Sequence, residues 1–300
     1  MHQQHRNDSF PKYIEARETL ILKPAILIAI EQRVSTAIKN SVVKNQDEYK
    51  HDYDAASMLF PFWENYPPEE RGRDPIGDQY PWIEVGEHAI GTKIARSMYE
   101  DFIVSDIGFP TGADQRFVLR SPDFLKLTDG LTDTVWLFLD IKSVGPRDDQ
   151  DHTVMSHNQI SGSGEWVHES EGVRNSIMVA QGKNAKHDFY PALPPIVILP
   201  TGEVAPLITM AIKPVYSMVP TSLGAGPKWL GQPLSRIDSI TIPNGLLLTQ
   251  NPNYLAKYPG LLFPGKDDKS KDPRKLRARV SFPILRQIAP WRHETISSWV

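Results

Sequence analysis

The sequence has no cysteine among its 300 residues. Disulfide bonds, thiolate nucleophiles and zinc sites built on cysteine are therefore excluded. It also lacks any run of about 18 or more apolar residues, so no membrane-spanning helix is expected. The first residues are polar and contain no apolar stretch typical of a signal peptide. These absences predict a cytoplasmic protein without a membrane partner.

The chain has little excess of either charge, with a formal net charge of −3, but the charges are unevenly distributed. Acidic residues outnumber basic ones about two to one over residues 44–101, whereas basic residues dominate residues 265–280. A basic segment of this kind is either a solvated surface or a surface that faces an anion.

Hydrophobic residues make up 40% of the chain, which is enough to bury a large core in one domain or two smaller ones. Strands and helices are predicted without strict alternation, which indicates an α/β fold with a mixed central sheet flanked by helices. Residues 60–81 and 145–190 are expected to be a loop and a long polar connection, for which disorder is the alternative. The predicted elements are helices over 25–45 and 84–99, strands over 102–108, 116–120 and 135–144, a hairpin over 196–216 that turns near Gly202, and a strand pair over 237–249 around Pro243-Asn244-Gly245.

An unusual junction stands at the end of the predicted strand 135–144, where "VWLFL" runs directly into Asp140, Ile141 and Lys142. Residues i and i+2 of a strand point to the same side, so Asp140 and Lys142 stand together and Ile141 points away. The apolar run predicts a strand covered on both faces. Charged groups there need a partner or a metal ion, and a structural salt bridge is the simplest alternative.

Two other motifs carry little weight. "GLLFPGKD" begins like a phosphate-binding P-loop, but Asp267 stands where a serine or threonine should hold magnesium. His152 and His157 are five residues apart in a polar segment, and a helical zinc pair would need a spacing of four.

Two further carboxylates lie upstream of the Asp140–Lys142 junction. Asp114 sits in "PTGADQR", a predicted turn between strands, and Glu87 lies on a predicted helix. Carboxylate oxygens bind hard Mg²⁺ ions, the metal activates water, and a lysine can stabilise charge at a phosphate. The set matches the PD-(D/E)xK nuclease pattern, except that Pro110 stands four residues before Asp114 instead of next to it.

The chain also closely resembles the BglI family of type II restriction endonucleases. The resemblance is spread over about residues 50–280, and it is weaker in the first 45 residues and at the extreme C-terminus. The matching stretches are "PFWENYPPEERGRDPIGDQYPWIEVGEHAIGTK", "GFPTGADQR", "LTDGLTDTVWLFLDIKSVGPRDD", "NQISGSGEW", "IPNGL", "PGKDDKSK" and "RARV".

The resemblance implies a homodimeric, Mg²⁺-dependent endonuclease that cuts double-stranded DNA in a prokaryotic cell. It implies an interrupted, GC-rich palindromic site like GCCNNNNNGGC, 3′ overhangs, and a methyltransferase that acts on the same site. It further implies a single restriction-endonuclease-like domain over residues 1–300. Its parts would be an N-terminal helical part (1–45), a catalytic core (84–145) and DNA-facing segments (145–190 and 260–282).

Site residues follow from the matching motifs. Catalytic residues are Glu87, Asp114, Asp140 and Lys142. The metal ligands are Glu87, Asp114, Asp140 and the backbone carbonyl of Ile141. Base-reading residues are Asp148, Lys266, Asp268, Arg277 and Arg279.

The chain departs from the family pattern at two places. Ala113-Asp114-Gln115 stands where the family has Pro-Asp-Glu, which keeps the ligand and loses a neighbouring carboxylate. "DPRKLRARV" also differs just before the arginines, which bears on base preference.

Two alternative functions remain open. One is a structure-specific or repair nuclease with the same core, and the other is a non-catalytic DNA-binding relative.

The segment "KLRARVSF" alternates apolar and polar residues, which predicts a strand with one buried face. Arg277 and Arg279 then share the other face, about 6.6 Å apart. Arginine pairs bidentately with guanine. An ordinary half-exposed strand with both arginines in water is the alternative.

Overall fold

A computed structural model describes residues 2–57, 87–106, 113–146, 148–168, 172–220, 230–265 and 276–299. Its α-helices are α1 (His2–Leu22), α2 (Pro24–Lys44), α3 (Gln46–Ser57), α6 (Thr92–Ser97), α7 (Pro122–Leu127), α8 (Gly245–Thr249), α9 (Tyr254–Lys257) and α10 (Phe282–Ile288). Short helical turns of other types are η2 (Glu87–Gly91), η3 (Met98–Glu100), η4 (His157–Gln159) and η7 (Pro290–Arg292). Within these residues no helix is long and apolar enough to cross a membrane.

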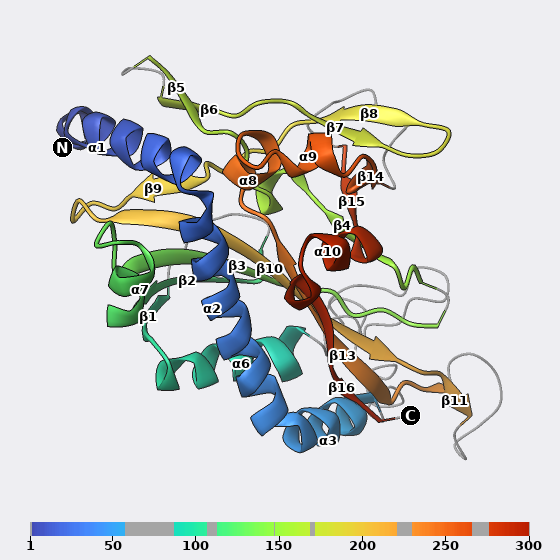
Figure 1. The fold of residues 1–300 in the computed structure, drawn as a ribbon. Coiled ribbons are helices and arrows are strands. Elements are labelled where there is room, and N and C mark those ends of the chain that lie inside the picture. Colours follow the sequence, from blue (N-terminus) through green and yellow to red (C-terminus); the bar gives the residue numbers. More distant parts are fainter. Residues whose placement is uncertain are drawn as a thin grey trace.

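A mixed sheet forms the centre of the molecule, with strand order β1-β2-β3-β10-β13-β16 and β9 paired to β10 (Figure 1). β3 and β10 run parallel, with Ile141 opposite Ile212, and the other pairs are antiparallel. The predicted α/β fold with a mixed sheet is therefore confirmed. These strands are β1 (Ile103–Asp106), β2 (Gln115–Arg120), β3 (Thr134–Ile141), β9 (Ile196–Ile198), β10 (Val204–Tyr216), β13 (Leu234–Ile242) and β16 (His293–Ser298).

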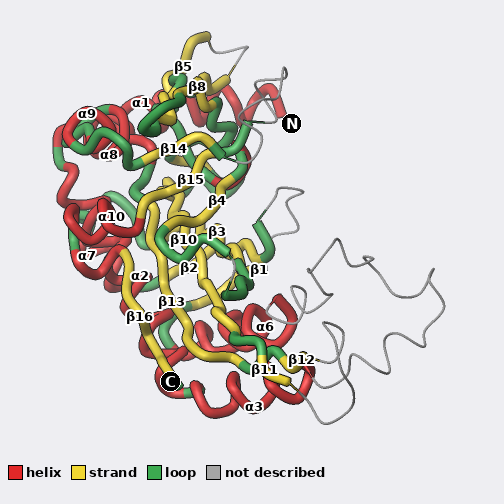
Figure 2. Tube along the Cα trace, turned by 90° about the vertical axis from the view of Figure 1, so that its right-hand side faces the viewer, coloured by secondary structure: helices red, strands yellow, loops and turns green. Residues whose placement is uncertain are grey.

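Helix α2 covers the sheet and confirms the helix predicted over residues 25–45. Its residues Ile30, Val34, Ile38 and Val42 are fully buried, as expected for apolar residues that recur every four positions. The helix packs against β10, β13 and β16. Figure 2 shows α2, α7 and α10 on the same side of the strands.

The hairpin predicted over 196–216 is confirmed as the antiparallel pair β9–β10. Gly202 in its turn has a φ of 88°, a left-handed conformation that glycine adopts without the steric cost of a side chain. The predicted strands 102–108, 116–120 and 135–144 correspond to β1, β2 and β3, and the predicted helix 84–99 to the run from η2 to η3.

A second, three-stranded sheet with order β14-β15-β4 lies beside the central sheet, near α10 (Figure 1). Its strands are β14 (Leu262–Pro264), β15 (Ala278–Ser281) and β4 (His152–Met155). The alternation predicted for "KLRARVSF" is confirmed on its apolar side: Leu276, Ala278, Val280 and Phe282 are buried.

The polar connection over 145–190 is ordered in its described part. Besides β4 it forms the hairpins β5–β6 and β7–β8 at the upper end of the view in Figure 1. The remaining small strands are β5 (Glu165–His168), β6 (Gly172–Arg174), β7 (Met178–Gln181), β8 (Lys186–Phe189), β11 (Val219–Pro220) and β12 (Leu230–Gly231). The loop predicted over 60–81 lies outside the described residues.

The predicted strand pair over 237–249 is wrong. β13 ends at Ile242, and Asn244 caps the N-terminus of α8 by accepting a hydrogen bond from the Leu246 N–H at 3.0 Å. The Asn244 amide also donates to the carbonyls of Pro195 and Leu207, at 2.9 and 2.8 Å. Asn-Gly is a hairpin signal in isolation, but here the asparagine side chain starts a buried helix.

Candidate functional site

Strand β3 fixes Asp140 and Lys142 at its C-terminal end. All eight residues of the strand are buried, so its backbone is held from both faces. The Asp140 carboxylate is 3% exposed and lies 2.6 Å from the ammonium of Lys142, which is 30% exposed. The Gln159 amide donates to the other Asp140 oxygen at 2.7 Å. The prediction that Asp140 and Lys142 stand together is confirmed, and Gln159 is a partner that the sequence did not indicate.

Asp114 joins this pair from the neighbouring strand. It directly precedes β2, and its Oδ2 accepts a hydrogen bond from the Ile141 N–H at 2.6 Å. In an antiparallel pair, the N–H and carbonyl of one residue point to the same neighbour. The Ile141 carbonyl therefore faces the side of β3 on which Asp114 lies.

Glu87 is the first residue of η2, and its side chain lies outside what the structure describes. The turn nevertheless packs against β3, since a Cβ added at Gly91 would lie 3.2 Å from Cγ1 of Ile141. Among the described side chains no group of three His, Asp or Glu residues is arranged to hold a metal ion. The oxygens available there, two carboxylates and one carbonyl, are the hard ligands that suit Mg²⁺.

A cavity of about 760 Å³ extends from Lys142 to the second sheet. Three of the predicted base-reading residues, Asp148, Arg277 and Arg279, line it together with Lys142. The structure thus brings these residues to one hollow. The other two, Lys266 and Asp268, lie outside the described residues.

Asp149 also lines this cavity, although no sequence motif singled it out. Its carboxylate is bonded to Nδ1 of His152 at 3.0 and 3.1 Å and lies 3.8 Å from the Arg279 guanidinium. Partial burial raises the pKa of Asp149, but the hydrogen bond and charge of His152, with Arg279, outweigh it and hold the pKa below its usual value. Asp149 therefore stays ionised beside Arg279.

Lys213, on β10, is a second residue that sequence reasoning missed. It is 1% exposed, and burial lowers its pKa to about 8 although Asp149 and Asp238 oppose the shift. The only signal was a single lysine inside the apolar run "MAIKPVY", where an unpaired charge is costly.

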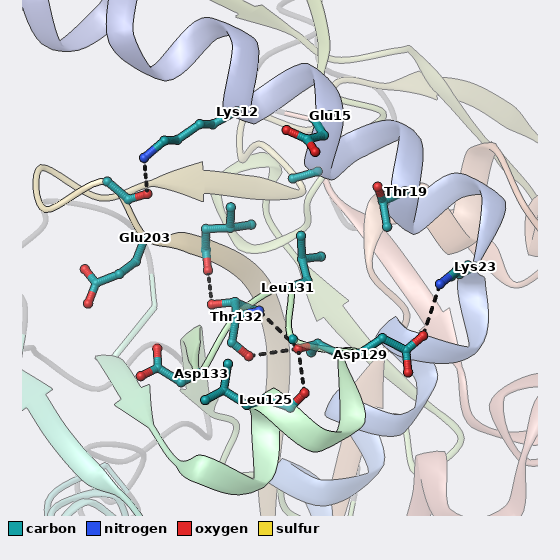
Figure 3. A pocket seen from close by; sticks show the side chains of 15 residues that line it. Lys12, Glu15, Thr19, Lys23, Leu125, Asp129, Leu131, Thr132, Asp133 and Glu203 are labelled. Atoms are coloured by element: carbon teal, nitrogen blue, oxygen red, sulfur yellow. Dashed lines mark hydrogen bonds and ion pairs between the residues drawn. The ribbon is translucent and has the colours of Figure 1, made fainter.

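Another cavity, of about 660 Å³, lies between α1, the β9–β10 turn and the turn after α7 (Figure 3). Its lysines already have partners: Lys12 donates to the Gly202 carbonyl at 3.4 Å, and Lys23 pairs with Asp129 at 3.1 Å. None of the predicted site residues lines it. Its chemistry does not point to a ligand. The cavity that Lys142 shares with three predicted base-reading residues is therefore the better candidate site of the two.

Comparison with known proteins identifies the family of the chain. The family described as restriction endonuclease BglI matches residues 8–296. The type II restriction enzyme BglI of Bacillus subtilis is 42% identical over 294 residues, which cover 97% of each chain. The match therefore includes most of the N-terminal region that showed less resemblance by motif.

Solved structures show the same fold. The crystal structure of BglI bound to its DNA recognition sequence superimposes with a TM-score of 0.89 at 42% identity, covering 99% of each chain. A tetrameric restriction endonuclease, SfiI, solved bound to cognate DNA, has a TM-score of 0.54 at 13% identity and covers 91% of this chain and 84% of its own. At that identity the second likeness concerns the fold alone.

Proposed function

The chain belongs to the BglI family of type II restriction endonucleases, and from this premise we propose that it cuts an interrupted, GC-rich palindrome by Mg²⁺-dependent hydrolysis. Membership makes it a site-specific deoxyribonuclease. The finer proposal is a site like GCCNNNNNGGC, cut in both strands to leave 3′ overhangs. The observation that best supports Mg²⁺-dependent hydrolysis is the set of Asp114, Asp140 and Lys142 at the end of β3.

In this proposal the metal would be held by Asp114, Asp140, the Ile141 carbonyl and Glu87. When bound, Mg²⁺ supplies charge neutralisation at the scissile phosphate and a more acidic water. Two carboxylates close together repel the polyanionic DNA unless a cation offsets their charge. The hydrogen bond from Ile141 to Asp114 keeps that carboxylate beside the end of β3 before DNA arrives.

Lys142 is the residue we assign to the chemical step. Its ammonium is held by Asp140 at 2.6 Å, yet its side chain remains 30% exposed at the cavity. A positive group placed there can orient the attacking water and stabilise negative charge that develops on the phosphate.

Base reading is assigned to the rest of the same cavity. Arg277 and Arg279 have the donors to pair with guanine, and Asp148 can accept from cytosine N4. Lys266 and Asp268 complete the proposed set on the basic segment 265–280. Carboxylates facing a polyanion are poor phosphate contacts, so Asp148 in this hollow favours a base-reading surface.

The proposed partners are double-stranded DNA and a second copy of the chain. A palindromic site read by one type of chain calls for a two-fold dimer with one active site per strand. A cytoplasmic nuclease of this kind also requires protection of the cell's own DNA, which we assign to a methyltransferase that modifies the same site.

Digestion of a DNA of known sequence in Mg²⁺, followed by sequencing of the fragment ends, tests this function. We expect discrete fragments whose ends all derive from one interrupted palindrome and carry 3′ overhangs. Cleavage that follows DNA structure instead of sequence would identify a structure-specific nuclease. Sequence-selective binding without cleavage would identify a non-catalytic relative.

A further inference from the structure

Lys213 is a buried lysine whose partners lie on the DNA-facing side of the molecule. Its Nζ donates hydrogen bonds to the backbone carbonyls of Asp149, at 2.5 Å, and His152, at 3.0 Å. The same atom lies 4.7 Å from the centre of the Phe282 ring. Burying an ammonium group is unfavourable unless other groups stabilise it. The two carbonyls and the Phe282 ring offset the lost hydration of Lys213 only while residues 149–152 keep their place beside it.

The strand that carries Lys213 is hydrogen-bonded to β3 and to the residues that follow it. β10 runs parallel to β3, and the Lys142 N–H donates to the Ile212 carbonyl at 2.8 Å. Two residues on, the Val144 N–H donates to the Pro214 carbonyl at 3.0 Å. Lys213 thus lies between the two backbone bonds that hold the segment just after Asp140.

The loop that Lys213 holds carries groups that face the cavity. Asp148 accepts a hydrogen bond from the Gly145 N–H at 2.7 Å and remains exposed. Asp149 lies beside Arg279 through its side chain and accepts from Lys213 through its backbone. A shift of this loop would therefore move Asp148 relative to Lys142 and would move Asp149 away from Arg279.

We propose that Lys213 is a positioning residue that couples base reading to DNA cleavage. It fixes the loop 148–152 to the strand bonded to Lys142, so that correct seating of Asp148 on a base and correct placement of Lys142 at the phosphate occur together. Both Nζ bonds go to backbone carbonyls, which makes a direct contact with DNA unnecessary for this role. The inference rests on the proposed function, because it requires Asp148 to read a base.

The test compares Lys213→Met, Asp148→Ala and the double variant in single-turnover cleavage. The substrates are the mapped site and a set of sites with one base pair changed in each half. Methionine keeps the length and apolar stem of lysine and removes its donors. Lys126→Met, on exposed α7, is the matched lysine control, and Ile30→Ala, in the buried face of α2, controls for lost stability.

We expect Asp148→Ala to lose discrimination at one base pair of each half-site by roughly tenfold or more. Lys213→Met should lose discrimination at the same base pair, and the double variant should be little worse than either single variant there. Lys126→Met should behave as wild type. Ile30→Ala should lower folding stability and leave the pattern of discrimination unchanged.

These results distinguish failure of base reading by Asp148 from failure of the coupling through Lys213. If Asp148→Ala has no position-specific effect, base reading by Asp148 is wrong and the coupling falls with it. If Asp148→Ala is position-specific but Lys213→Met slows all sites equally, only the coupling is wrong. If Lys213→Met does not fold, Lys213→Arg, which keeps charge and donors, must show a partial loss at that base pair. Failure of both variants to fold would show a purely structural lysine and overturn the inference.

Discussion

The side chain of Lys142 pairs with the buried Asp140 carboxylate and is partly exposed at the cavity. We predict that Lys142→Ala lowers the single-turnover cleavage rate by at least about 10²-fold, similar to loss of other groups that stabilise a transition state. DNA affinity in Ca²⁺ should change much less. Lys126→Ala, an exposed lysine on α7, is the control. A loss of affinity with an unchanged rate would show that Lys142 only anchors the DNA backbone.

The lowered pKa of His293 makes the free energy of unfolding depend on pH. Burial, aided by the charges of Arg286 and Lys213, lowers its pKa to about 4, although Asp238 opposes the shift. Its ring stacks on Phe282 at 4.2 Å between centroids. Between pH 6.5 and 4 the unfolded chain binds a proton at this residue that the folded chain does not, so the free energy of unfolding falls as pH falls.

We therefore predict that this residue removes on the order of 3 kcal/mol of stability between pH 7 and pH 4. Urea unfolding of wild type and His293→Gln at several pH values measures it, since the variant lacks the titrating group. His51→Gln, at a histidine whose side chain is 81% exposed, is the control. Equal pH dependence in wild type and His293→Gln would rule the assignment out.

At the scale of elements, β15 presents Arg279 to the cavity while its alternate residues are buried. Arg279→Ala should cost roughly 1–3 kcal/mol at one base pair of each half-site. Cleavage of singly substituted sites should show relaxed preference at that pair alone. A uniform loss over all sites would instead identify a phosphate contact.

Elements defined by local pattern could be predicted from the sequence. The period-2 segment around Arg279 and the four-residue spacing in α2 depend on neighbours in the chain, and burial follows directly from them. Asp114, Asp140 and Lys142 could be grouped because β2 and β3 are consecutive strands. Their common placement at the end of β3 was therefore accessible from motif and resemblance together.

Features that depend on distant contacts could not be predicted. Asn244 reads locally as a hairpin turn, yet its amide bonds to carbonyls of Pro195 and Leu207 on other segments. Lys213 has no motif at all, because its partners are backbone carbonyls 61 and 64 residues away along the chain. Such roles become visible only when the sheet brings the segments together.

On the scale of the whole molecule, one chain supplies one set of Asp114, Asp140 and Lys142, whereas a cut of both strands in one binding event uses two sets. We predict a homodimer of twice 33.9 kDa in solution. Sedimentation of the free protein and of its DNA complex measures the mass. A monomer in both states would contradict the two-fold reading of a palindrome.

We propose that carboxylates at the end of β3 hold the metal that drives cleavage. Asp140→Asn keeps the shape of the side chain and removes its charge, and Asp129→Asn, at a carboxylate that is 68% exposed, is the matched control. DNA binding in Ca²⁺ and cleavage in Mg²⁺ are measured in parallel. We predict that Asp140→Asn binds the mapped site as tightly as wild type and cuts it at least about 10³-fold more slowly. Cleavage by Asp140→Asn within about tenfold of wild type would contradict it.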